Sequence, residues 1–84
     1  HQGNGTHACF ADDPTVDTFS MHGAKKFPFH KVSGTRDVEL EDGTGDDTYL
    51  ELLREHLPEV LRASRPDLVV YLSGADPHEG DRLG

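Results

Sequence analysis

The strongest hydrophobic pattern is a run of five apolar or aromatic residues near the end of the chain, at 68–72. The run is rich in β-branched valine, and Gly74, Asp76 and Pro77 follow it at once. Continuous apolar runs that are bounded by turn residues are typical of strands buried on both faces of a parallel sheet. The pattern therefore predicts a buried strand over 68–72 that leads into a polar loop.

A helical pattern precedes this run and continues to about Ala63. Its apolar positions recur at helical spacing: Leu50, Leu53, Leu57, Val60 and Leu61. Thr44 and Thr48 each stand three residues before an acid, which is the spacing of an N-terminal cap. Pro58 is expected to bend or split the helix, and residues 65–67 to end it. A helix followed by a strand is half of a βαβ unit, so we expect a parallel sheet.

The first half of the chain has weaker patterns. Residues 6–12 are expected to form a short helix that Pro14 prevents from continuing. Residues 15–20 are β-prone by their valine, threonine and phenylalanine content, and 38–41 alternate apolar with acidic residues, so both are predicted strands. Residues 21–37, which are rich in glycine, lysine, proline and histidine, are expected to form a loop.

The predicted elements do not complete a sheet that is covered on both faces. The chain has 84 residues, of which 33% are hydrophobic, and it offers one long amphipathic helix. It also starts at His1 rather than methionine and stops after a turn. We therefore expect residues 1–84 to be part of a larger α/β domain whose N-terminal and C-terminal parts lie outside them.

Charge and cysteine content narrow the classes of partner. Sixteen acids against eight bases give a net charge of −8, which argues against nucleic acid or an anionic membrane surface as a partner. No apolar run approaches the length of a membrane span. Cys9 is the single cysteine, which excludes an internal disulfide and suits a reducing, intracellular compartment.

Six histidines and many carboxylates raise the question of a metal site, but no compact metal-binding motif is present. Asp76 stands out because ligands gather beyond the carboxyl ends of strands in open α/β sheets. A carboxylate just past a buried strand also needs a positive partner to offset its desolvation. The structural alternative is that Asp76 caps the following turn through backbone amides.

The motifs together resemble the zinc-dependent histone deacetylase family, in that family's order and through the whole chain. They are His-Gln-Gly-Asn-Gly-Thr at 1–6, Ser-Met-His at 20–22, Val-Glu-Leu-Glu-Asp-Gly-Thr at 38–44, Gly-Ala-Asp at 74–76 and Glu-Gly-Asp-Arg-Leu-Gly at 79–84. Gln2, where many relatives carry a second histidine, and the 79–84 ending look most like the class IV branch and bacterial relatives. The resemblance implies a segment of a parallel-sheet, three-layer fold of the arginase–deacetylase type.

The resemblance also implies a zinc site. His1 and Asp76 match two of the family's three zinc ligands, and the remaining aspartate would lie two residues before His1. The family's catalytic histidines would lie upstream and its catalytic tyrosine downstream, so no catalytic residue is expected within 1–84. Fe²⁺ suits the same nitrogen and oxygen ligands as Zn²⁺.

Structural monovalent cations are implied as well. Ser20 and Met21, with the His1 carbonyl, match the family's inner potassium (K⁺) site. The residues that match its outer site, mostly through carbonyls, are Phe10, Asp13 and Val16. Phe27 resembles one aromatic wall of the tunnel that binds the acyl-lysine side chain, with an ordinary loop aromatic as the alternative.

The implied function is a zinc-dependent amidohydrolase that removes acetyl or longer acyl groups from lysine side chains of proteins, or from related small acylated amines. Its location would be cytoplasmic, or nuclear in a eukaryote. Two ligands hold zinc poorly, so residues 1–84 alone are expected to be inactive. One alternative is a non-catalytic binding or scaffold relative. Another takes His1 as a mature N-terminus that chelates copper in a small secreted oxidative enzyme.

Overall fold

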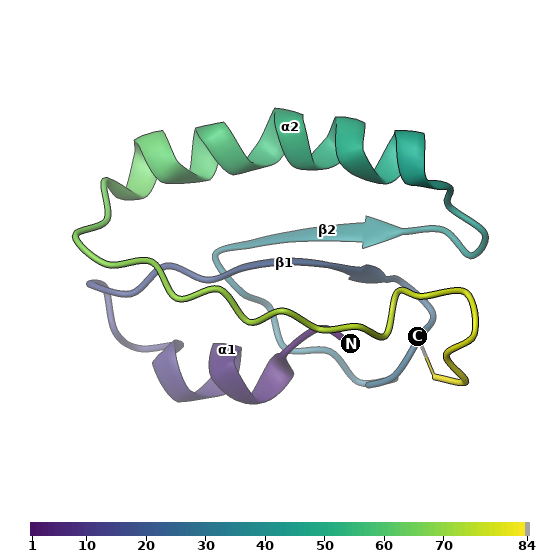
Figure 1. Ribbon diagram of the computed structural model, residues 1–84. Helices are drawn as coiled ribbons and strands as arrows, with labels where there is room; N and C mark the ends of the chain where they lie inside the picture. Colours follow the sequence, from purple (N-terminus) through teal and green to yellow (C-terminus); the bar gives the residue numbers. More distant parts are fainter. Residues whose placement is uncertain (84) are drawn as a thin grey trace.

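The structure is a computed structural model that describes residues 1–83. Its elements in chain order are α1 (Asn4–Phe10), β1 (Phe19–Gly23), β2 (Arg36–Leu40) and α2 (Asp46–Ser64). In Figure 1 the two strands run between α2 and α1. The protein is therefore an α/β protein, as predicted. Gly84, the last residue of the 79–84 motif, lies outside the described residues.

The two strands pair in parallel, with Ser20 opposite Asp37 and Met21 opposite Val38, so the predicted parallel sheet is confirmed. The pairing begins before the strands, where the backbone amide of Thr18 donates to the Thr35 hydroxyl at 2.9 Å. The predicted strand over 15–20 was placed too early, because β1 starts at Phe19 and includes three residues that were expected in a loop. Pairing with β2, and not β-propensity alone, decides where this strand lies.

Both helices differ in detail from their predicted bounds. Helix α1 starts two residues earlier than expected, after Gly3, whose φ of 81° is readily adopted only by glycine. Helix α2 is capped by Gly45 without a side-chain hydrogen bond, so the predicted threonine cap is wrong; Thr44 Oγ1 instead donates to the Glu41 carbonyl at 2.6 Å. Pro58 lies inside the continuous α2 and does not split it.

The end of α2 is where the pattern placed it, and Arg65 terminates the helix with a left-handed backbone, φ 47°. Among residues 1–83, no helix combines the length and the apolar character that crossing a membrane requires.

Residues 68–72 do not form the buried strand that their sequence predicts. No strand is assigned there, and Leu68 and Tyr71 are 81% and 84% exposed. Figure 1 shows the segment as an irregular trace that returns from the end of α2 to the C-terminal loop. An apolar run of this kind specifies burial on both faces of a sheet. The two strands and one long helix among the described residues do not provide that environment.

The interior beside the sheet is largely polar. Its buried side chains include Val38 and four polar ones, Gln2, His7, Ser20 and His22. The amide of Gln2 makes three hydrogen bonds: Nε2 donates to the Val32 carbonyl at 2.6 Å and to Asp37 Oδ1 at 3.0 Å, and Oε1 accepts from the Val32 amide at 3.1 Å. Gln2 thus joins the segment before α1 to the loop before β2 and to β2 itself.

We expect Gln2→Met to lower the free energy of unfolding by about 1–3 kcal/mol, because methionine keeps the volume but leaves partly buried polar groups of Val32 and Asp37 without these bonds. The measurement is urea denaturation of the longest natural protein that contains this sequence. Ser33→Ala, at an exposed neighbouring position, serves as the control and should change stability by less than about 0.5 kcal/mol. Equal stability of Gln2→Met and wild type would contradict the role given to this amide.

Candidate metal and substrate site

His1 and Asp76, the two predicted zinc ligands, lie against each other although 75 positions separate them. The main-chain nitrogen of His1 contacts Oδ2 of Asp76. The His1 side chain is 42% exposed and the Asp76 side chain 15% exposed. The turn that contains Asp76 is closed by its backbone, from the His78 amide to the Ala75 carbonyl at 3.1 Å. The Asp76 carboxylate therefore faces His1, beside a turn that the main chain closes.

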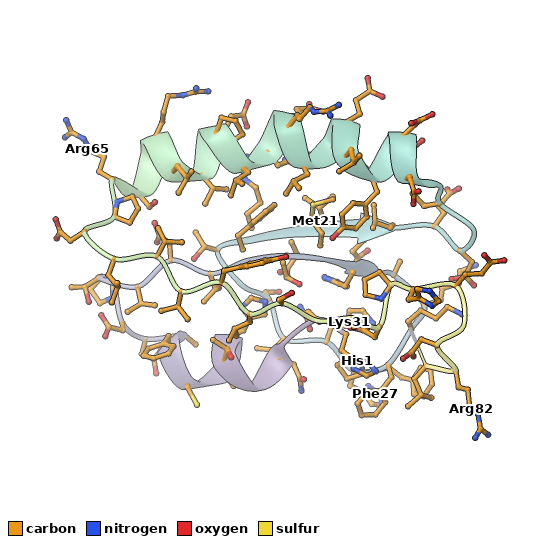
Figure 2. All side chains as sticks on the ribbon, in the orientation of Figure 1. His1, Met21, Phe27, Lys31, Arg65 and Arg82 are labelled. Atoms are coloured by element: carbon orange, nitrogen blue, oxygen red, sulfur yellow. The ribbon has the colours of Figure 1, made fainter. Side chains whose placement is uncertain are left out.

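Phe27, the predicted tunnel aromatic, contacts the imidazole ring of His1. Its ring meets the imidazole edge-to-face, with ring centroids 5.3 Å apart and an interplanar angle of 79°. Figure 2 shows the two side chains together, and Phe29 extends the cluster at 6.1 Å from Phe27. Edge-to-face contacts of this kind are favourable for aromatic rings. The structure thus brings all three of His1, Asp76 and Phe27 to one place.

A hollow of about 130 Å³ opens beside the first two of these residues. Its walls include His1 and Asp76, together with Gly23 and Leu40, the last residues of β1 and β2. The hollow therefore lies at the carboxyl ends of both parallel strands, which is where ligands bind in open α/β sheets.

The predicted inner cation position falls on β1 next to this hollow. Ser20 Oγ donates to the Gln2 carbonyl at 2.7 Å and lies 2.9 Å from His22 Nδ1. If Ser20 Oγ donates to Gln2, His22 donates from Nδ1, and its buried Nε2 has no hydrogen-bond partner among the described residues. Burial lowers the pKa of His22 although Asp37 nearby opposes that shift, so the ring is neutral at pH 7. The Met21 side chain points to the α2 side of the sheet (Figure 2).

The three residues of the predicted outer cation site also lie together. Phe10, Asp13 and Val16 line a second hollow, of about 290 Å³, beyond the end of α1. The Asp13 amide donates to the Phe10 carbonyl at 3.1 Å, and the Val16 amide donates to the Asp13 carbonyl at 3.2 Å. Hydrogen bonds from the hydroxyl and the amide of Thr15 lower the pKa of Asp13. Cation binding at this hollow stays a prediction.

The donors that the described residues bring together match zinc in kind but not in number. An imidazole and a carboxylate are ordinary zinc ligands, and catalytic zinc uses three protein ligands. Within residues 1–83, no group of three histidine, cysteine or acidic side chains lies close enough to hold a metal ion. His1 and Asp76 therefore supply two donors of the kind that zinc takes, and zinc binding by them stays a prediction.

Some residues that shape the site carried no recognised signal in the sequence. Asp37 accepts a hydrogen bond from the Gly34 amide at 2.7 Å as well as the one from Gln2, and its Oδ1 lies 3.4 Å from His7 Nε2. The one indication for Asp37 in the sequence was its position directly before the predicted strand at 38–41. Lys31 binds two carbonyls around Phe27, and nothing in the periodicity of its loop indicates that contact.

Comparison with known proteins identifies the family of the chain. The sequence model of the histone deacetylase domain family matches residues 1–84. An uncharacterized protein of Picosynechococcus sp. is 51% identical over 84 residues, which are 100% of this chain and 28% of that protein. Histone deacetylase 2 of Arabidopsis thaliana is 37% identical over 87 residues, covering 100% of this chain and 22% of that protein. The acetoin utilization protein AcuC of Bacillus subtilis is 33% identical over 95 residues, covering 99% of this chain and 24% of that protein.

The chain thus spans between 22% and 28% of the length of these three relatives. The match runs through the predicted ligand positions at both ends of the chain and through the loop that carries Phe27. The chain belongs to the histone deacetylase domain family.

Proposed function

We propose that these residues form part of the active site of a zinc-dependent amidohydrolase that removes acetyl or longer acyl groups from lysine side chains of proteins, or from related small acylated amines. The observation that carries the proposal is that His1 and Asp76 line one hollow at the carboxyl ends of both strands, and that the His1 ring contacts Phe27. Metal-ligand chemistry and an apolar substrate wall thus meet at a single residue. Membership of the histone deacetylase family supports the same reaction class.

In this proposal His1 and Asp76 hold the zinc ion together with a third ligand from elsewhere in the protein. When bound, the metal would polarise the acyl carbonyl and make a bound water more acidic. The low exposure of Asp76 keeps its carboxylate out of bulk water, where it would be solvated rather than bound to a cation. The residues that transfer protons in the family would also come from outside 1–84.

Phe27 would provide apolar surface for the neutral acyl-lysine stem and would exclude water from it. Two acidic residues line the hollow, Glu41 and Asp42, of which Asp42 pairs with Lys26 at 3.9 Å. Glu41 favours a substrate with a basic residue beside the acylated lysine. Ser20 would take part in binding a structural K⁺ ion, and a second monovalent cation would bind near Asp13. The names of the relatives point to histones in one case and to acetoin utilization in another, so the acylated substrate is proposed at the level of its chemistry.

Asp76→Ala is expected to reduce hydrolysis of an acetyl-lysine peptide roughly 100-fold or more, because it removes one of the ligands that position the metal. The measurements are peptide hydrolysis, metal content and circular dichroism, all made on the longest natural protein that contains this sequence. Asp67→Ala is the matched control, since it removes an exposed carboxylate ahead of the same apolar run. Wild-type turnover by a correctly folded Asp76→Ala protein would reject Asp76 as a ligand.

Residues 1–84 alone are expected to bind zinc weakly and to hydrolyse no acetyl-lysine peptide, because they bring only two ligands together. Calorimetric titration of zinc into these residues and into the longest natural protein tests this directly. Tight zinc binding with turnover by the 84 residues would overturn the expectation. Absence of zinc binding in both proteins would instead favour a non-catalytic scaffold function.

A further inference from the structure

We propose that Lys31 is a positioning residue that holds the Phe27 ring against His1 and so fixes the aromatic wall that the acyl-lysine stem would contact. This inference rests on the proposed function and assigns a specific task within that site to a residue of the connecting loop. The hydrogen bonds of Lys31 go to the backbone on either side of Phe27. It acts through Phe27.

The Lys31 ammonium makes a pair of hydrogen bonds to the backbone. Nζ donates to the Lys26 carbonyl at 2.7 Å and to the Pro28 carbonyl at 2.7 Å, in a partly buried position. These two carbonyls flank Phe27 on either side in the sequence. One ammonium therefore closes the backbone around the aromatic residue, and it uses two of its three donors to do so.

Hydrogen bonds also hold the backbone next to Lys31. Val32 is held at both its amide and its carbonyl by the Gln2 side chain, at 3.1 and 2.6 Å. Gln2 follows His1 directly. The contacts therefore form a closed circuit that runs from His1 through Gln2, Val32 and Lys31 to Phe27, and back to His1 through the ring contact. Figure 2 shows Lys31, His1 and Phe27 in one group.

Apart from its contact with His1, the Phe27 ring is only partly packed against other side chains. Its side chain is 47% exposed, and Phe29, its other aromatic neighbour, is 75% exposed. Because the ring is not packed into a core, its contact with His1 depends on where its backbone lies. The two Lys31 hydrogen bonds hold the backbone on both sides of Phe27.

The test compares Lys31→Met, which keeps the apolar stem and loses the donors, with Lys31→Arg, which keeps donors at the same place. In the longest natural protein, Lys31→Met should raise KM for an acetyl-lysine peptide about three- to tenfold, with kcat within about twofold of wild type. Lys31→Arg should restore most of the wild-type KM. Lys25→Met, at an exposed lysine of the same loop, is the matched control and should leave KM unchanged. A fall in kcat at unchanged KM would show a loss of active protein and would overturn the positioning role.

A second readout does not depend on activity. With 4-fluorophenylalanine at position 27, the fluorine NMR resonance should shift toward the free amino acid in Lys31→Met and stay in place in Lys25→Met. An unchanged resonance in Lys31→Met would also overturn the inference. If the wild-type protein hydrolyses no acyl-lysine, the proposed function fails, and the fluorine resonance alone then decides whether Lys31 positions Phe27.

Discussion

Burial of the Gln2 amide is the interaction on which the described structure depends most. The side chain is 5% exposed, and a primary amide at that depth is costly unless its donors and acceptor are all used. Val32, in the loop before β2, and Asp37, in β2, meet that requirement. Because Gln2 adjoins His1, the same bonds that satisfy the amide also set where His1 lies relative to the sheet.

The ionisation of Asp37 is part of this arrangement. Burial alone would raise the pKa of Asp37, but hydrogen bonds from Gly34 and Gln2, with His7 and His22 nearby, lower it overall. The carboxylate therefore stays charged and remains an acceptor for the Gln2 amide. Its negative charge also opposes the effect of burial on the pKa of His22. A polar interior beneath two short strands is thus held together by one anion and its donors.

The sequence pattern predicted the α/β class and the end of α2, because both depend on local signals. It also predicted a parallel sheet, but from a helix followed by a strand at 68–72, whereas the observed parallel pair is β1 with β2. It failed at 68–72, where five apolar residues indicate burial in a sheet larger than the described residues form. His1, Asp76 and Phe27 could be named only through resemblance to a family, since no spacing in the sequence joins them. Lys31 and Gln2 could not be named as supports, because their contacts exist only once the 24–35 loop has folded back.

The position of Asp76 is informative because the segment before it is so exposed. Residues 68–72 make no strand that could fix where the following loop lies, yet the Asp76 side chain is only 15% exposed and contacts His1. The loop thus lies at the site although no strand is assigned at 68–72. Both strands end at the same hollow as this contact, so the site and the carboxyl edge of the sheet coincide. A parallel strand over 68–72, if other segments covered it, would deliver Asp76 to that same edge, since the carboxyl ends of parallel strands meet there.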